Sequence, residues 1–371
     1  LDATSIPRPH SRHLKDRGCV YQPNTIIGNK PITIGHKYSV LSSLIKEEIT
    51  NHNWSIPIDG KRITSFDTDI EIGIEQIITF LDNCPQDIPH KLSVLVTDTT
   101  YSNKNFFYPL SHYNNLVIIS RVRSNRVFYR AIAPDNQHQK KTGHPLWYGD
   151  KFDLKDNLSW WDEDSHISQI ITNKKGEDIN VHIKCWNNLV MKGDKINKMH
   201  NSPFRLLQIT LTDENGKLVK KPMWLIVFGE RRNELDLFQC YQCYCQRFDM
   251  EHLFRFSKNK LLLNKYLTPH VNREENWFSL VLLSYVNLWA ARKLAINFPR
   301  PWEKYNYKKT PQKITPSIVQ KDFKRIIRTF GEKTTSPKPR GYSSGRKKGE
   351  KLPPKIIYPI VKKQFQAKKA S

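Results

Sequence analysis

The sequence predicts an α/β protein in which helices flank a mixed sheet and a β-rich insertion interrupts it. The clearest evidence is a strand–helix–strand alternation, with apolar runs at 92–97 and 116–120 on either side of a helical pattern over 105–113. From about residue 123 to 237 the apolar runs shorten and the charge rises, which is typical of shorter strands. The 371 residues suffice for one large domain or two smaller ones.

Two β-like segments, 32–44 and 54–58, precede this alternation, and Asp59–Gly60 has the composition of a turn after the second. The periodic isoleucines of 70–81 predict a helix. Carboxylates cluster at its start, where they favour the helix dipole, and we prefer this interpretation to a metal-binding role. The cluster consists of Asp67, Asp69 and Glu71.

The insertion contains four candidate strands, 126–131, 181–186, 204–211 and 218–228. The last two flank a hairpin with Asn215–Gly216 at its tip. Tryptophans are spread through the region, and we expect most to pack, although an exposed one could stack on a nucleic-acid base. They are Trp147, Trp160, Trp161, Trp186 and Trp224.

After the insertion, a long apolar pattern at 272–296 and a shorter one at 315–330, ended by Gly331, predict two further helices. The shorter helix has a basic face, and the residues after it have the Pro, Gly, Ser and Lys content of a disordered tail. The predicted organisation begins with the first part of the α/β core at 1–122 and the insertion at 123–237. The second part of the core follows at 238–300, then a basic helical extension at 301–331 and a disordered basic tail at 332–371.

The formal net charge of +25 predicts a polyanionic partner, most simply DNA or RNA rather than a membrane surface. Residues 301–371 hold 20 Lys and Arg against four Asp and Glu, so most of the excess lies there. This arm is typical of salt-dependent binding to phosphates, with a solubilising tail as the alternative. No apolar run reaches the 18 residues of a membrane span, and the start shows no signal-peptide pattern.

The six cysteines are unevenly scattered, which favours free thiols in a reducing compartment. Cys240, Cys243 and Cys245 are close enough to suggest a metal site, but no second pair with zinc-like spacing follows, and buried thiols are the preferred interpretation. The sequence has no Gly-rich phosphate loop of the GxxxxGK[ST] type and no GxSxG motif, so nucleotide hydrolysis and serine-hydrolase chemistry are unsupported.

Tyr244 to Lys258 contains no Pro or Gly and is rich in good helix formers, so it predicts a helix. At about 100° per residue, Tyr244, Arg247, Glu251 and Lys258 share a stripe about 60° wide. A carboxylate between two cations on one face can hold a metal while the cations hold phosphate. The alternative is an ordinary amphipathic helix with an Arg247–Glu251 pair worth only about 0.2–0.5 kcal/mol.

Three carboxylates stand out as candidate metal ligands: Asp2 and Asp98, each interpreted as following a strand end, and Glu251 on the later helix. Ligands in α/β sheets bind beyond the carboxyl ends of strands. Oxygen ligands suit Mg²⁺, and two such ions about 3.5–4 Å apart can clamp the attacking and leaving oxygens of a phosphodiester.

These residues resemble a known family. Tyr244-x2-Arg247-x3-Glu251-x6-Lys258 matches the YREK signature of bacterial insertion-sequence transposases of the Asp-Asp-Glu (DDE) type, with all four residues at the family's spacing. Asp98, in Val-Thr-Asp-Thr-Thr-Tyr-Ser-Asn, looks like the second Asp of that family, and Asp2, in Leu-Asp-Ala-Thr, looks like the first. The end of the chain, from Thr315 to Arg346, is similar to one subgroup.

The resemblance implies an RNase H-like core with a β-rich insertion and a transposase that cuts double-stranded DNA at its element's ends and joins the freed 3′-OH to target DNA. Asp2, Asp98 and Glu251 would be catalytic and would ligate two Mg²⁺, or Mn²⁺, while Tyr244, Arg247 and Lys258 would bind DNA phosphates. The implied protein is a homodimer on DNA, acts in the cytoplasm at the nucleoid, and needs neither a nucleotide cofactor nor a membrane.

The sequence departs from the family at its front, because the usual helical DNA-end-binding domain and an intact strand before the first Asp are missing ahead of Leu1. This predicts a truncated or remnant protein and leaves the activity of the chain open. The alternatives are a non-catalytic DNA-binding remnant and a metal-dependent nuclease without strand transfer.

Overall fold

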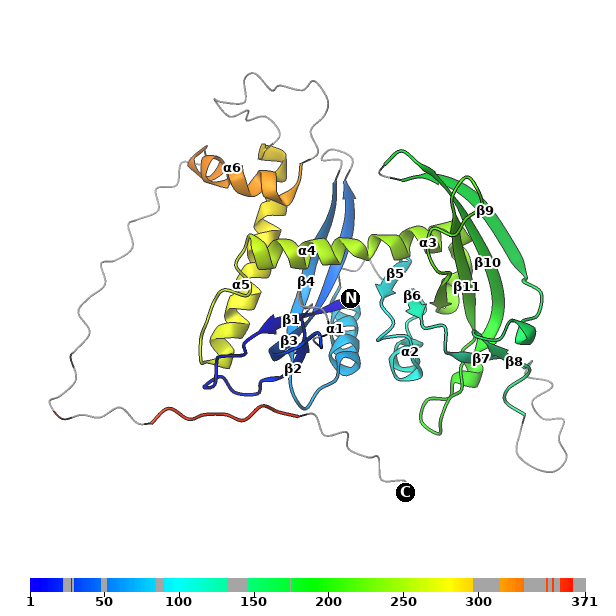
Figure 1. The fold of residues 1–371 in the computed structure, drawn as a ribbon, viewed down its shortest axis with the longest axis horizontal. Coiled ribbons are helices and arrows are strands. Elements are labelled where there is room, and N and C mark those ends of the chain that lie inside the picture. The colour runs from blue at the N-terminus through cyan, green and yellow to red at the C-terminus, as the bar shows by residue number, and fades with distance from the viewer. Residues whose placement is uncertain are drawn as a thin grey trace, which may run out of the picture. The chain divides into compact units, whose positions relative to one another are not determined.

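The computed structural model describes residues 1–22, 28, 30–47, 52–84, 90–132, 146–173, 175–295, 314–329, 345, 349 and 354–362. The chain divides into two compact units (Figure 1). Unit 1 comprises Leu1–Asp2 and Asp67–Phe248, and unit 2 comprises Ala3–Phe66 and Asp249–Ser371. The divisions fall near the start of strand β1 (Asp2–Pro7) and of helix α4 (Phe248–Asn259), so each element begins in unit 1 and continues in unit 2.

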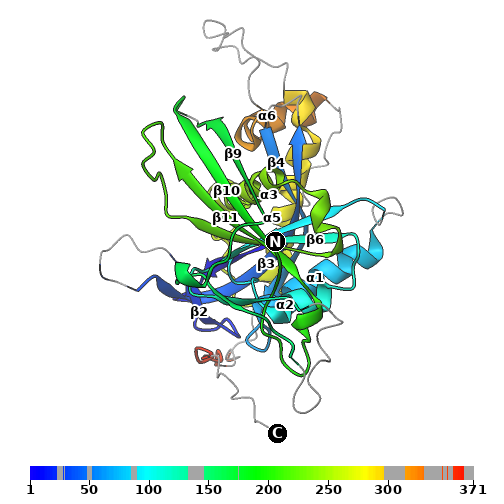
Figure 2. The ribbon, with the colours of Figure 1, turned by 90° about the vertical axis from the view of Figure 1, so that its right-hand side faces the viewer.

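Unit 1 is built on an eight-stranded mixed sheet in the order β5-β6-β12-β11-β10-β7-β8, with β9 pairing β10 beside that path. The β5–β6 pair is parallel, and the other pairs are antiparallel. The strands are β5 (Ser93–Thr97), β6 (Leu116–Val122), β7 (Val127–Arg130), β8 (Lys151–Asp153), β9 (Ser165–Thr172), β10 (Asp178–Val190), β11 (Phe204–Thr212) and β12 (Met223–Phe228). Strands β9, β10 and β11 run side by side in Figure 2.

Helices cover both faces of this sheet. On one face, α3 (Leu237–Gln246) inserts Leu237, Cys240 and Tyr241 among the buried side chains of β6, β10, β11 and β12. On the other, α2 (Lys104–Leu110) places the Phe107 ring 5.0 Å from that of Phe228. Helix α1 (Asp69–Asn83) begins with a capping box between Thr68 and Glu71, so helix initiation accounts for the acidic cluster. These elements confirm the predicted mixed α/β fold with an RNase H-like arrangement.

The strands of the expected insertion continue the core sheet instead of forming a separate body. Strand β12 pairs directly with β6, with Trp224 opposite Val122 and Phe228 opposite Ile118. The predicted hairpin after β11 is present, because β11 and β12 are antiparallel and Gly216 takes a φ of +77° in the turn. Trp186 and Trp224 are buried, as the packing interpretation requires.

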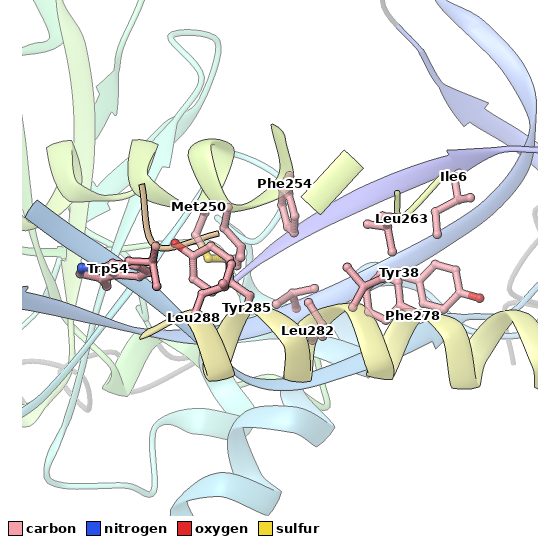
Figure 3. Packing of buried hydrophobic residues seen from close by; sticks show 14 of the residues in the cluster. Ile6, Tyr38, Trp54, Met250, Phe254, Leu263, Phe278, Leu282, Tyr285 and Leu288 are labelled. Atoms are coloured by element: carbon pink, nitrogen blue, oxygen red, sulfur yellow. The ribbon is translucent and has the colours of Figure 1, made fainter. Parts of the chain in front are cut away.

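Unit 2 contains a smaller sheet in the order β1-β3-β2, with β4 pairing β3. Its strands are β1, β2 (Gly18–Tyr21), β3 (Ile32–Glu47) and β4 (His52–Ile63), and its helices are α4, α5 (Val271–Ala290) and α6 (Pro316–Thr329). An apolar core lies between strands and helices (Figure 3). There the Tyr38 and Phe278 rings stack with centroids 4.1 Å apart, and Trp54 meets Tyr285 edge-on at 5.7 Å.

Asp59–Gly60 is not a turn, which corrects the sequence prediction. Both residues lie inside β4, opposite Leu41 and Val40 of β3, next to a register shift. A Cβ on Gly60 would come within 2.4 Å of Leu282 Cδ1 and 2.7 Å of Phe278 Cε1. The glycine therefore serves the close approach of α5 to the strand instead of a change of chain direction.

A buried charged network fixes the start of α5 to the small sheet. The Glu274 side chain is 1% exposed and accepts hydrogen bonds from Arg8 Nε at 2.8 Å and Tyr38 Oη at 3.1 Å, while His36 Nδ1 lies 2.7 Å away. The remaining Arg8 donors reach the carbonyl oxygens of residues 264 and 266, at 3.1 and 2.7 Å. Every charge in the network is thus paired, as burial requires.

Residues 354–362, within the range expected to be disordered, form an extended segment that pairs with the N-terminal part of unit 2. We call it the C-terminal strap. Tyr358 N donates to Arg12 O at 3.0 Å, Val361 N donates to Arg17 O at 2.7 Å, and Val361 forms a parallel bridge with Gly18. The other residues of 332–371, apart from 345 and 349, lie outside the described residues, as do 301–313 and 330–331 of the expected helical extension.

Among the described residues, no helix combines the length and the apolar character that crossing a membrane requires.

Glu274→Gln is expected to destabilise the protein by roughly 3–5 kcal/mol, because it leaves the Arg8 guanidinium buried without its counter-charge. Burial acts to raise the pKa of the Glu274 carboxyl, but the hydrogen bond with His36 and the charges of His36 and Arg8 hold it below its usual value of 4.5. The carboxylate's contribution to stability is therefore present above pH 4.5 and is lost as the pH falls through the folded-state pKa. Denaturant unfolding from pH 7 to pH 3 measures both effects.

Glu275→Gln is the matched control, because Glu275 is 41% exposed and pairs with Arg62 at 2.6 Å. Such a pair is worth about 0–1 kcal/mol. Equal losses of unfolding free energy in Glu274→Gln and Glu275→Gln would contradict the assigned role of the buried network.

Candidate functional site

Asp98 lies immediately after β5, at the carboxyl end of the parallel β5–β6 pair. Its Oδ1 accepts a hydrogen bond from Thr100 N at 2.8 Å, and its Oδ2 accepts one from Thr100 Oγ1 at 3.3 Å. Ser120 Oγ, in the neighbouring strand, donates to the Asp98 carbonyl oxygen at 3.0 Å. The half-buried carboxylate is therefore held by its own turn, and the backbone of Asp98 by β6, at the sheet edge where ligands bind.

Asp2 is the first residue of β1, which corrects the interpretation that it follows a strand. The backbone nitrogen of Leu1 donates to Val96 O at 3.2 Å, so this end of β1 lies beside β5, two residues before Asp98. Strand β1 therefore starts next to the strand that Asp98 follows, although Asp2 and Asp98 are far apart in the sequence.

Arg247 is tied to Asp2 by an ion pair. Its Nη1 lies 3.1 Å from Asp2 Oδ2, and the two side chains are only 12% and 17% exposed. The guanidinium carbon also lies 5.1 Å from the Phe248 ring centroid and 6.0 Å from that of Tyr244. Aromatic surface therefore fixes the cation from one side while the carboxylate of the first strand fixes it from the other.

The segment predicted as one helix forms two helices. Helix α3 ends at Gln246, α4 starts at Phe248, and Arg247 N donates to Tyr244 O at 3.1 Å, three residues back. Arg247 itself keeps right-handed helical angles, with φ −53° and ψ −32°, so the chain changes its hydrogen bonding and not its conformation where Arg247 meets Asp2.

Tyr244 is enclosed by protein, so the structure does not present it to DNA. Its side chain is 2% exposed and belongs to the apolar cluster of α3 with the large sheet. The expectation that it contacts phosphate conflicts with this position. Its observed contact with Arg247 gives it a supporting role.

Glu251 and Lys258 lie on the part of α4 that belongs to unit 2, whereas Asp2, Asp98, Tyr244 and Arg247 belong to unit 1. Glu251 is exposed and Lys258 is half-buried. Burial lowers the pKa of the Lys258 ammonium, and in the described part of the chain no carboxylate forms an ion pair with it. Such a cation favours an incoming anion, because pairing offsets its desolvation.

The oxygen donors of Asp2 and Asp98 are of the kind that bind Mg²⁺, which is commonly held by one or two carboxylates together with substrate phosphates. Within the described ranges no group of three or more His, Cys, Asp or Glu side chains could hold a metal ion. Burial raises the pKa of the Cys240 thiol to about 12 and also raises those of Cys243 and Cys245. Burial therefore disfavours the thiolate, which is the form that binds metals.

Sequence reasoning missed the two residues that orient Asp98. Thr100 and Ser120 contribute a hydroxyl each, and Thr100 also contributes its backbone N–H. Asp98 followed two residues later by a turn residue is the signature of an Asx turn, so the Thr100 bond could have been inferred. The Ser120 contact depends on the pairing of β5 with β6 and has no local signal.

Tyr244→Ala is expected to cost roughly 3–5 kcal/mol of stability, because it removes a fully buried aromatic ring. Tyr244→Phe, which keeps the ring, is expected to lie within about 1 kcal/mol of the parent. Denaturant midpoints for both variants measure the difference. A Tyr244→Phe variant of unchanged stability with strongly weakened DNA binding would contradict the supporting role and restore a direct contact.

Comparison with known proteins finds a family match in the N-terminal part of the chain. No curated protein matches the sequence significantly. Residues 1–178 match the family described as DDE superfamily endonuclease, a range that contains Asp2 and Asp98 but ends before Glu251. The match is to an endonuclease family and covers a little less than half of the chain.

Proposed function

We propose that this protein is a metal-dependent DNA transposase that cleaves phosphodiesters at the ends of a mobile element and transfers the freed ends to target DNA. The observation that carries the proposal is the placement of Asp2, paired with Arg247, at the start of a strand that lies beside β5, the strand that Asp98 follows. The endonuclease-family match over residues 1–178 supports nuclease-type chemistry on DNA. The YREK spacing from Tyr244 to Lys258 supports the finer assignment to insertion-sequence transposases.

In this proposal Asp2, Asp98 and Glu251 would have to come together on binding DNA to hold two Mg²⁺, or Mn²⁺, which would stabilise negative charge on the reacting oxygens. Thr100 restrains the Asp98 carboxylate through two hydrogen bonds, while Ser120 holds the Asp98 backbone through its carbonyl oxygen. Water attacks phosphorus first, and the released 3′-OH attacks second, each in line with the departing oxygen. The active form is a homodimer on DNA that acts at the nucleoid.

Arg247 and Lys258 bind the DNA phosphates that flank the scissile bond. Arg247 is already oriented by Asp2 and two aromatic rings, so it loses little conformational freedom when a phosphate arrives. Lys258 is half-buried and gains stability from any anion that reaches it. Tyr244 stabilises the position of Arg247 from beneath.

Glu251→Gln is expected to abolish Mg²⁺-dependent cleavage of duplex DNA while leaving DNA affinity unchanged. Loss of about 4 kcal/mol of transition-state stabilisation lowers the rate about 10³-fold. Asp98→Asn should act in the same way, and Glu214→Gln, on the exposed β11–β12 turn, is the charge-matched control. Cleavage and binding are measured on the same labelled duplex, with and without Mg²⁺.

Full cleavage by Glu251→Gln would eliminate the catalytic assignment and favour a protein that only binds DNA. Joining of a 3′-OH end to a second duplex by the parent protein separates a transposase from a nuclease without strand transfer.

Lys258→Ala is expected to weaken DNA binding and to reduce the slope of log K against log salt by about one, the value for one phosphate contact. Lys258→Arg keeps the charge and should restore the slope. Binding isotherms between 50 and 200 mM salt give the measurement. If the alanine variant keeps the parental slope, Lys258 makes no phosphate contact.

A further inference from the structure

Helix α6 is held rigidly on unit 2 by its apolar face. Val319 and Ile326 are buried, and Phe323 packs against the same core. Gln320 Nε2 donates to the carbonyl oxygen of Lys260 at 3.1 Å, just beyond the end of α4. The orientation of α6 on this unit, and therefore of its outer face, is fixed.

The outer face of α6 carries a row of exposed cations. Lys321, Lys324 and Arg328 are all exposed. Their spacing of three and seven residues places them in a stripe about 60° wide and about 10 Å long. The carboxylate of this helix, Asp322, is buried and lies 3.6 Å from Arg325, so it does not neutralise the row. We call these three residues the α6 ridge.

We propose that the α6 ridge is a sequence-independent binding surface for the phosphate backbone of duplex DNA. The choice of DNA rests on the proposed function. Duplex DNA presents one negative charge per about 1.7 Å of its axis, so a row about 10 Å long faces several phosphates at once. Because the helix is already packed, no ordering of this helix opposes binding, unlike in a disordered basic arm.

A membrane surface fits the ridge less well. A helix that binds membranes inserts its apolar face between the lipids. In α6 that face is already occupied, because Val319 and Ile326 are buried in the core of unit 2. The cations are then the main groups available for binding, which favours a polyanion over a lipid surface.

An ordinary solvated helix face is the alternative, with Arg328 in the last turn interacting favourably with the helix dipole. That role predicts a change in stability when the cations are removed and no specific change in DNA binding. The salt dependence of binding therefore separates the two interpretations.

The test is a triple variant, Lys321→Gln, Lys324→Gln and Arg328→Gln, with binding to a random-sequence duplex measured in EDTA between 50 and 200 mM salt. Removing three phosphate contacts should reduce the slope of log K against log salt by about 2.7 for a duplex and about 2.1 for a single strand. The variant Lys321→Arg, Lys324→Arg, Arg328→Lys keeps the charges and should keep the slope.

The matched control removes the same charge elsewhere, by Lys155→Gln, Lys175→Gln and Lys217→Gln at exposed positions of unit 1. An equal change in the control, or no change in the ridge variant, would overturn the proposal. If the ridge triple variant unfolds, Lys324→Gln alone should lower the slope by about 0.9. An unchanged slope for that single variant would overturn it as well.

Two further measurements separate this proposal from others. If the ridge variant loses binding to vesicles containing anionic lipid but keeps its DNA slope, the ridge is a membrane surface and the proposal fails. Suppose that Glu251→Gln keeps full cleavage while the ridge variant shows the reduced slope of log K against log salt. The catalytic assignment then fails, and the proposal that the α6 ridge binds DNA stands.

Discussion

The ion pair between Arg247 and Asp2 is the contact on which the candidate site depends. It joins residues 245 positions apart and brings the start of the first strand to the junction between two helices. A pair this poorly exposed persists only where its surroundings hold it in place, and the rings of Tyr244 and Phe248 do so here. The pair adds to the packing of α3 against β5 and β6, the strands at whose end Asp98 lies.

Much of the fold could be predicted because its signals are local. Apolar runs marked β5 and β6, and the capping residues and periodic isoleucines marked α1. The sequence predictions that were wrong concern positions where tertiary packing decides the local structure. Asp59–Gly60 has the composition of a turn, but the approach of α5 keeps it inside a strand. Likewise, short strands separated by polar loops cannot reveal that β12 pairs with β6 in a common sheet.

The candidate site was less predictable than the fold. The spacing from Tyr244 to Lys258 identified the residues, and Asp98 was recognisable at the end of an apolar strand. Helical periodicity placed Tyr244 on the same face as Arg247, whereas the packing of α3 on the large sheet buries the tyrosine ring. The partner of Arg247 could not be inferred, because Asp2 reaches it through the arrangement of the strands and no local pattern links the two.

The C-terminal strap makes the folding of unit 2 depend on the order of synthesis. The carbonyl oxygens of Arg12 and Arg17 accept hydrogen bonds from the backbone nitrogens of Tyr358 and Val361, more than 300 residues later. A ribosome adds about 5–20 residues per second, so this stretch waits tens of seconds for those partners. During that interval its carbonyl groups must be satisfied by water or by a chaperone.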